Sequence, residues 1–159
     1  MAYYKDLREH LSALEQRGKL LRIERPINKD TQLQPLVRLQ FRGLPEEQRK
    51  AFLFTNVFDS RGKQYSTPVA MGALAGSSEI YSIGLMCPRE GISARLTQAE
   101  LNPIEPKLVD GGPVQEEVHL VDGLLEHGGL DEFPVPIATP GFDVAPYLSS
   151  SAWVTKDPD

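Results

Sequence analysis

The chain contains three histidines and one cysteine, the side chains best suited to bind a metal or act as a nucleophile. His119 and His127 lie eight residues apart in an acidic stretch, and with Glu126 they form a conceivable metal site. Such loose spacing arises freely in polar segments, and no closely spaced ligand pair accompanies it. We therefore predict no metal ligand. His10, next to Glu9 on a predicted helix, is expected to be a solvated surface residue.

Cys87 and the glycine-containing run Met71–Glu79 are the remaining chemical candidates. No base neighbours Cys87 in the sequence, so we expect a half-buried small apolar residue rather than a catalytic thiolate. The run MGALAGSSE follows a predicted strand and opens a predicted helix, where phosphate-binding loops lie. It matches neither the Walker nor the dinucleotide motif, so close packing of a helix on a sheet explains its small residues better than phosphate binding.

Two pairs of adjacent carboxylates, Glu116/Glu117 and Asp131/Glu132, could in principle serve acid–base chemistry. Neighbouring residues of an extended chain face opposite sides, so neither pair forms a catalytic dyad by itself. These motifs predict no catalytic residue.

Composition narrows the functional classes. The 159 residues carry a net charge of −5, which leaves no basic excess for nucleic acid. No apolar run reaches the ~20 residues of a membrane span, and the N-terminus does not resemble a secretory signal. One cysteine forms no internal disulfide, so we expect a cytoplasmic protein.

Charge is unevenly distributed along the chain. Residues 1–100 have a net charge of +4, whereas residues 101–159 have −9 and hold eight of the 13 prolines. This shift predicts a domain boundary or a long acidic crossing segment near residues 102–113. We expect an N-terminal α/β domain over residues 1–105 and a separate acidic, proline-rich segment over 106–159.

Apolar periodicity predicts the elements of the N-terminal part. Helices are expected near residues 4–17, 32–42, 77–85 and 93–101, the second capped by Asp30 or Thr31 and carrying Phe41 in its apolar stripe. Strands are expected near 19–24, 51–57 and 67–74, in one sheet of an α/β layer fold. The predicted core comprises Leu7, Leu11, Leu14, Leu36, Phe52, Phe54, Val69 and Met71.

The acidic part is less regular. Residues 114–120 favour an extended edge segment, 120–127 one or two helical turns, and 133–140 an extended proline-rich stretch. Residues 147–156 favour a strand, and the turn-forming Asp-Pro-Asp follows it. A single strand leaves its backbone groups unpaired, so we expect a longer natural sequence, strand addition to another chain, or docking of this strand across residues 1–100.

Three stretches of the sequence fit one family pattern. The opening Asp6–Ile23, with D-x-R-x-x-L-x-x-L-E-x-x-G-x-L before a strand, resembles the N-terminus of the UbiD-type decarboxylase family. Phe52–Asn56 and Val69–Gly72 follow the family's order of strands. The most specific stretch is Phe133–Asp159, where a P-I-P-like run, D-x-x-P-Y, a strand and T-K-D-P resemble the entry into the family's flavin domain, a split β-barrel.

The resemblance implies a reversible, non-oxidative decarboxylase of aromatic or α,β-unsaturated acids. Family members use prenylated FMN, a divalent metal, usually manganese (Mn2+), and a monovalent cation such as potassium (K+). The family's metal ligands and catalytic residues correspond to positions after Asp159, so none is assigned here; Ser150 is the one cofactor-binding candidate. Full-length members are oligomers, with the small acid and the rest of the enzyme as the implied partners. The alternative is a short, non-catalytic UbiD-like subunit that docks on a larger partner.

Overall fold

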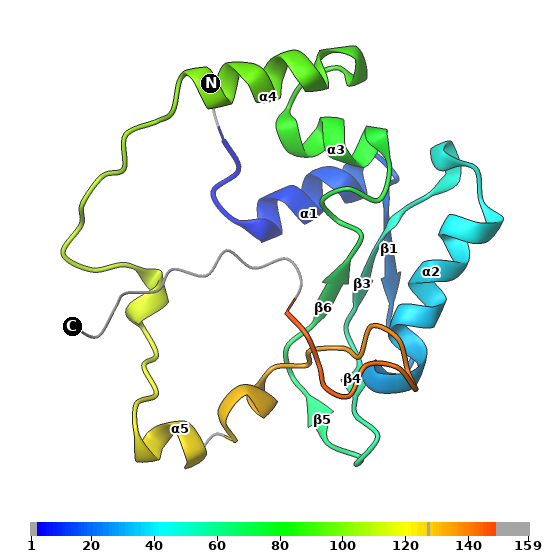
Figure 1. Cartoon of the computed structure of the whole chain (residues 1–159), viewed down its shortest axis with the longest axis vertical. Coiled ribbons are helices and arrows are strands. Elements are labelled where there is room, and N and C mark those ends of the chain that lie inside the picture. Colours follow the sequence, from blue (N-terminus) through cyan, green and yellow to red (C-terminus); the bar gives the residue numbers. More distant parts are fainter. Residues whose placement is uncertain (1–2, 127, 149–159) are drawn as a thin grey trace.

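A three-stranded sheet organises the N-terminal two thirds of the protein (Figure 1). The computed structural model describes residues 3–126 and 128–148. Strands β1 (Leu20–Ile23), β3 (Ala51–Phe54) and β6 (Val69–Met71) lie in the order β1-β3-β6. β1 is parallel to β3 and β6 is antiparallel to it. The prediction that these three segments share one sheet is confirmed.

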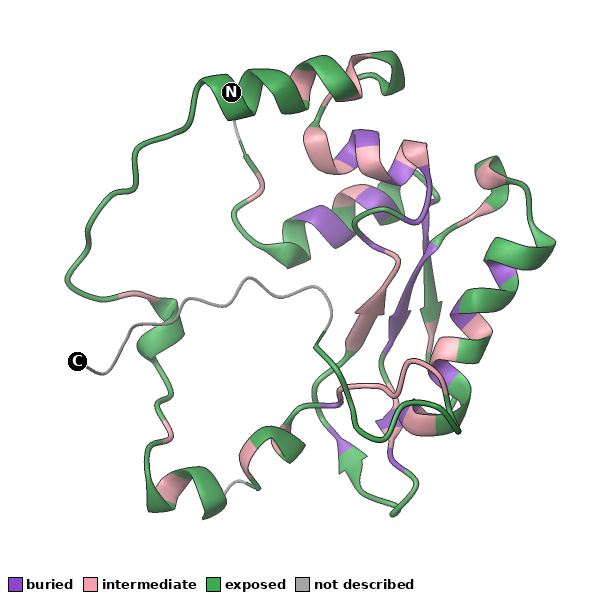
Figure 2. Ribbon diagram, viewed as in Figure 1, coloured by how far each residue is buried: buried purple, intermediate pink, exposed green. Residues whose placement is uncertain are grey.

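The central strand β3 is buried on both sides. Side chains alternate along a strand, so Ala51 and Leu53 face one way while Phe52 and Phe54 face the other. Two separate cores result. The first contains Leu11, Leu14, Leu20, Ala51, Leu53, Ala73, Ile80 and Ile83. The second contains Ile27, Leu33, Val37, Phe52, Phe54 and Val57. Figure 2 shows this buried centre between helices on either face of the sheet.

Helix α1 (Leu7–Gln16) contributes to the first core and begins at a side-chain cap. The Asp6 carboxylate accepts the backbone N–H of Glu9 at 3.0 Å, and Gly18, at φ 67°, ends the helix in the left-handed region. Leu11 and Leu14 are buried as predicted, but Leu7 is 52% exposed. The prediction that Leu7 belongs to the core is wrong, because its side chain lines a cavity with Leu74, Tyr81 and Leu85 instead of packing into the first core.

Helix α2 (Gln34–Gly43) covers the opposite face of the sheet and follows a π-helical turn, Lys29–Leu33. The turn is capped by Asn28, whose side chain accepts the backbone N–H groups of Asp30 and Thr31. The prediction that Asp30 or Thr31 is the cap is therefore wrong.

Phe41, predicted in the apolar stripe of α2, is 44% exposed, whereas Gln40 is buried. The Gln40 amide donates to the Lys50 carbonyl and accepts the Lys50 N–H, so a polar side chain satisfies buried backbone there. Of the other predicted core residues, Phe52 and Phe54 are buried, and Leu36, Val69 and Met71 are partly buried against the second core.

A second, smaller sheet extends the first. The predicted strand 51–57 divides at Thr55 and Asn56, and β4 (Val57–Phe58) then lies between β2 (Ile27–Asn28) and β5 (Gln64–Tyr65). β2 is parallel to β4, and β4 pairs with β5 as a hairpin. The predicted turn at Asp59–Gly62 is the turn of this hairpin, with the Asp59 carbonyl accepting the Gly62 N–H at 3.0 Å.

Two further helices complete the N-terminal part, close to the predicted positions. Helix α3 (Ser78–Leu85) packs on α1, and α4 (Ile92–Leu101) packs on α3. Short 3₁₀ turns, Glu46–Gln48 and Arg89–Gly91, connect neighbouring elements.

Residues 102–148, which we call the arm, contain little regular secondary structure and are mostly exposed (Figures 1 and 2). Within the described part of the arm, the only regular elements are the 3₁₀ turns Pro113–Gln115 and Gly129–Glu132 and the short helix α5 (Asp122–Glu126). The helical turns predicted at 120–127 are present. The prediction of an extended edge segment at 114–120 is wrong. The chain begins this stretch in the 3₁₀ turn Pro113–Gln115 and pairs with no strand among the described residues. None of the helices described is long and apolar enough to cross a bilayer.

Candidate functional site

An apolar groove lies where the arm returns to the sheet. Two adjoining cavities of about 290 and 300 Å³ share a wall formed by Phe133, Val135, Tyr147 and Leu148. The opposite wall of one cavity is strand β6 with Thr67 and Pro68 before it. Lys29 and Asp131 are the charged residues among those lining the groove, and Lys29 Nζ is paired with the Asp30 carboxylate at 2.6 Å. This lining suits an apolar surface rather than acid–base chemistry.

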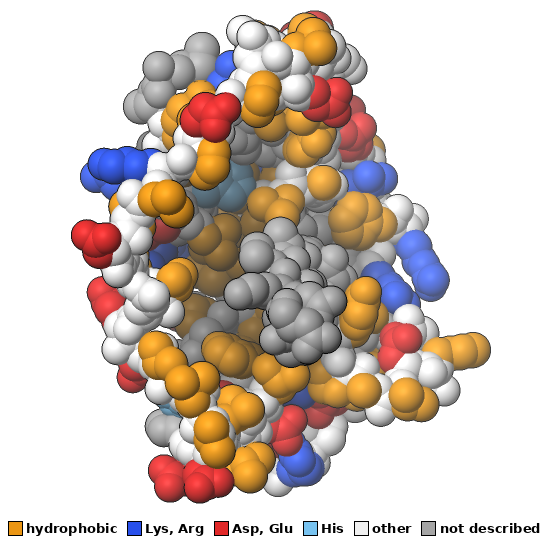
Figure 3. Space-filling model, turned by 60° about the vertical axis from the view of Figure 1, so that its left-hand side comes forward, with side chains coloured by type: hydrophobic (Ala, Val, Ile, Leu, Met, Phe, Trp, Pro, Cys, Tyr) orange, Lys and Arg blue, Asp and Glu red, His pale blue; other side chains and the backbone are white. Residues whose placement is uncertain are grey.

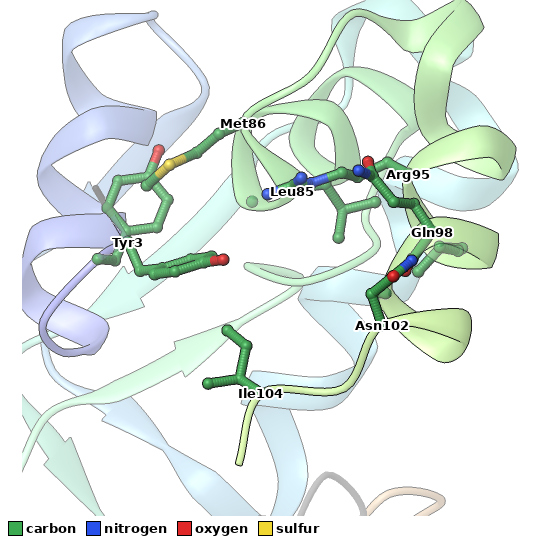
Figure 4. A pocket seen from close by; sticks show the side chains of 11 residues that line it. Tyr3, Leu85, Met86, Arg95, Gln98, Asn102 and Ile104 are labelled. Atoms are coloured by element: carbon green, nitrogen blue, oxygen red, sulfur yellow. The ribbon is translucent and has the colours of Figure 1, made fainter. Parts of the chain in front are cut away.

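A larger hollow of about 710 Å³ lies between the N-terminal segment, α3 and α4 (Figure 4). Leu85, Met86 and Ile104 supply apolar walls, and Gln98 and Asn102 lie side by side at its α4 edge. The space-filling view shows hydrophobic side chains gathered around the hollowed face of the molecule (Figure 3). Tyr3 and Ile104, which line the hollow, are 60% and 73% exposed. The hollow offers amide and aromatic contacts but no nucleophile among its described lining residues.

His10 lies beside this hollow and is buried, so the prediction of a solvated surface residue is wrong. Its Nε2 lies 2.7 Å from the Ala73 carbonyl oxygen, which can only accept, so Nε2 carries the hydrogen. The ring also contacts Tyr4, whose hydroxyl donates to the Ile83 carbonyl at 3.0 Å. His10 therefore fastens α1 to the loop after β6, a role that its sequence neighbours do not indicate.

The glycine-containing run after β6 is a packing device. A Cβ atom at Gly76 would lie 2.6 Å from the Gly72 carbonyl oxygen, so only glycine fits there. At the start of α3 the Ser77 hydroxyl accepts the Ile80 N–H, and the Glu46 carboxylate accepts the Ser78 N–H. That N–H lowers the pKa of Glu46. The Glu46 carboxylate thus occupies the N-terminus of α3, the position at which a phosphate-binding loop would hold its phosphate.

The remaining sequence candidates do not assemble into a metal or nucleophile site. His119 Nδ1 lies 3.8 Å from a Glu132 carboxylate oxygen, and His127 lies outside the described residues. No group of three His, Cys, Asp or Glu side chains within residues 3–126 and 128–148 could hold a metal ion. Cys87 is half-buried, as expected for a small apolar residue.

Comparison with known proteins assigns the N-terminal part. Residues 11–99, which include most of α1 and continue through most of α4, match the family model described as "3-octaprenyl-4-hydroxybenzoate carboxy-lyase N-terminal domain", UbiD_N. The chain belongs to the UbiD family. The matched region contains both hydrophobic cores, so the family assignment and the two-sided packing concern the same elements.

Two solved UbiD-class structures share this architecture. An evolved dimeric form of HmfF from Pelotomaculum thermopropionicum, in complex with prFMN, is 29% identical, with a TM-score of 0.62. That match covers 86% of this chain and 29% of that chain. HmfF from the same organism in complex with FMN is 30% identical, with a TM-score of 0.59, over 84% of this chain and 27% of that chain. The chain thus spans less than a third of these UbiD-class relatives.

Sequence reasoning placed one UbiD-type cofactor contact, Ser150, which lies outside the described residues. The sequence did not predict the hydrogen bonds that join separate segments through Gln40, His10, and the set formed by Asp59, Arg61 and Asp131. One signal was available for Asp59, because an aspartate that opens a turn commonly accepts backbone N–H groups two residues on. Asp131, the long-range partner of Arg61, lies 70 residues away and had no local signal.

Proposed function

We propose that this chain is the N-terminal part of a UbiD-class enzyme that decarboxylates, reversibly and without oxidation, an aromatic or α,β-unsaturated carboxylic acid. The match of residues 11–99 to the UbiD N-terminal domain carries this proposal. The motif stretch 133–159 supports it, because it resembles the family's entry into the flavin domain. The domain division at about residue 105, a cytoplasmic location and homo-oligomers of the whole enzyme are parts of the same proposal.

Prenylated FMN, Mn²⁺ and K⁺ are the cofactors proposed for the whole enzyme. The similarity to HmfF structures that hold prFMN or FMN supports the flavin. The described residues of this chain do not fit these groups: they include no three-ligand metal cluster, and Glu46 takes the helix N-terminus best placed for a phosphate. We therefore derive no catalytic step here. Ser150 remains the proposed cofactor contact, in a strand over residues 147–156 that would begin a split β-barrel after the acidic, proline-rich crossing segment; the two together make up residues 106–159.

A non-catalytic subunit that docks on a larger partner is the second candidate. The arm favours it, because it carries apolar side chains that the described residues leave open to solvent: Leu108 is 98%, Val114 90% and Val144 102% exposed. Large apolar side chains gathered on a surface mark a partner interface. In the decarboxylase the partner would be the rest of the same enzyme; in the second candidate it would be a separate chain.

Intact mass of the natural protein and a decarboxylation assay separate the two candidates. The natural protein, supplied with prenylated FMN, MnCl₂ and KCl, should release CO₂ from an aromatic or α,β-unsaturated acid. We expect the 159-residue chain alone to bind neither prenylated FMN nor Mn²⁺ in stoichiometric amount, measured by flavin absorbance and metal analysis after gel filtration. A natural protein of 17.7 kDa that gains activity only with a second chain would favour the docking subunit.

A further inference from the structure

A buried carboxylate organises the turn of the β4–β5 hairpin. Asp59, 2% exposed, accepts the backbone N–H groups of Arg61 at 2.9 Å and Lys63 at 2.8 Å. It also accepts Arg61 Nε at 3.2 Å, and the Tyr65 hydroxyl lies 3.4 Å from the same oxygen. The Asp59 carboxylate therefore fixes the position of the Arg61 guanidinium through a contact within the hairpin.

The hairpin presents two cations to one residue of the arm. Arg61 donates from Nη2 to the Asp131 carboxylate at 2.9 Å, and Lys63 Nζ donates to the Asp131 backbone oxygen at 2.6 Å. Gly128 and Gly129, at φ 83° and 59°, turn the arm just before this contact, a conformation that favours glycine. The 3₁₀ turn Gly129–Glu132 then presents Asp131 to both cations.

The arm residues just beyond this contact form the shared wall of the apolar groove. Leu130 and Asp131 line one of its cavities, and Phe133 and Val135 line both. A second tie follows, where Arg38 on α2 donates to the Thr139 hydroxyl at 2.9 Å. Thr139 N in turn donates to the Asp143 carboxylate, which turns the arm back toward Tyr147. The wall is thus anchored to the folded part on both sides of Phe133 and Val135.

We propose that Arg61, held by Asp59, is a positioning residue: through Asp131 it fixes the arm on the β4–β5 hairpin and so sets the wall of the groove that leads to residue 148. An exposed ion pair alone contributes little to the stability of a docked segment, because the entropy lost in ordering two flexible side chains cancels most of the electrostatic attraction. Here Asp59 orders the arginine in advance, so docking the arm orders mainly Asp131. Under the proposed function, this contact places the start of the flavin-binding part relative to the N-terminal domain.

Hydrogen exchange measured by mass spectrometry on the 159-residue chain tests the positioning role. Asp131→Asn and Arg61→Gln should each speed amide exchange in residues 128–135 by roughly two- to five-fold, the range that measured couplings of exposed ion pairs allow. Asp110→Asn, an equal charge change elsewhere in the arm, should leave this peptide unchanged. Raising NaCl from about 0.05 to about 0.5 M should speed exchange there in the wild type and have little effect in Asp131→Asn.

The same samples give an internal control for folding. Exchange in the β3 peptide, residues 51–54, should stay as in the wild type in Asp131→Asn and Asp110→Asn, because neither residue belongs to a hydrophobic core. Exchange in 128–135 that is as slow in Asp131→Asn as in Asp110→Asn would overturn the proposal. None of these measurements depends on activity, so failure of the decarboxylase proposal would not affect the result.

Discussion

The sheet core and the arm contain similar apolar side chains but bury them to very different extents. All four residues of β3 are buried, whereas Leu108, Val121 and Val144 in the arm are 98%, 83% and 102% exposed. The first region places its apolar residues at the spacing of paired strands and packed helices, so each meets a partner. The arm has the same residue types without that spacing and without a described strand. Apolar content therefore predicts burial only where periodicity and pairing accompany it.

The two regions are also held by different forces. The core depends on apolar contact on both faces of one sheet. The described hydrogen bonds and ion pairs of the arm with the folded part run through Asp131 and Thr139, and its apolar side chains line the groove and, at Ile104, the larger hollow. Changes in the core should therefore alter the free energy of unfolding of the whole domain, and changes in the arm should act locally.

The largest difference is expected from removing a leucine side chain in each region. Leu14 is fully buried and Leu125 is 77% exposed. Leu14→Ala should lower the free energy of unfolding by about 2–5 kcal/mol, because it leaves a cavity in the first core. Leu125→Ala should change it by less than about 0.5 kcal/mol. Urea unfolding followed by circular dichroism measures both; equal losses would mean that the arm is part of the cooperative unit.

Glycine-to-alanine substitutions give the next contrast. A Cβ at Gly76 meets the Gly72 carbonyl oxygen at 2.6 Å, whereas a Cβ at Gly112 in the arm meets nothing within 4 Å. Gly76→Ala should cost about 1–3 kcal/mol, because backbone must move to admit the methyl group. Gly112→Ala should be close to neutral, since its φ of −152° suits any residue. A neutral Gly76→Ala in thermal unfolding would refute the close-packing interpretation of MGALAGSSE.

Asp59 holds Arg61, which contacts the arm through Asp131, and it should make stability depend on pH. Burial raises the pKa of its carboxyl, but the Lys63 N–H and the Arg61 guanidinium outweigh this and hold the pKa below the ordinary 3.8. A lowered folded-state pKa means that the stabilisation is complete above the unfolded value and is lost as pH falls through the folded value.

Asp59→Asn should lower the free energy of unfolding at pH 7 by roughly 1–3 kcal/mol, because buried N–H groups lose a charged acceptor. Its unfolding curves should also be less sensitive to pH below about 4 than those of the wild type. Asp110→Asn, the same substitution at an exposed position of the arm, is the matched control. An unchanged pH profile in Asp59→Asn would assign the acid sensitivity to other carboxylates.

The smallest effect is expected at two left-handed residues that are not glycine. Met86 ends α3 at φ 51°, and Val121 precedes α5 in the arm at the same φ. Glycine relieves the steric cost at either position. Met86→Gly should raise the free energy of unfolding by about 0.5–1 kcal/mol. Val121→Gly should leave global unfolding unchanged and slow amide exchange only near residues 122–126; a global gain from Val121→Gly would remove the distinction between the regions.

The local elements and the family could be predicted from the amino-acid sequence. Leu11 and Leu14 recur at helical spacing, Gly18 supplies a left-handed end, and β-prone runs near 20, 51 and 69 predict strands. Each of these signals lies within a few residues of the chain, whereas the prediction of one sheet came from the alternation of strands and helices. The ordered motifs also indicated the UbiD family, which the match to residues 11–99 shows.

Contacts between side chains that are distant in the sequence could not be predicted, because they depend on how the elements pack. In the folded chain Leu7 and Phe41 are exposed, and His10 and Gln40 are buried with backbone partners on other segments, because burial depends on what packs against each side chain and not on periodicity alone. Folding also brings Arg61 to Asp131, 70 residues along the chain. The sequence records both charges, but their contact exists only because the hairpin turn and the two glycines before Asp131 place them within hydrogen-bond distance.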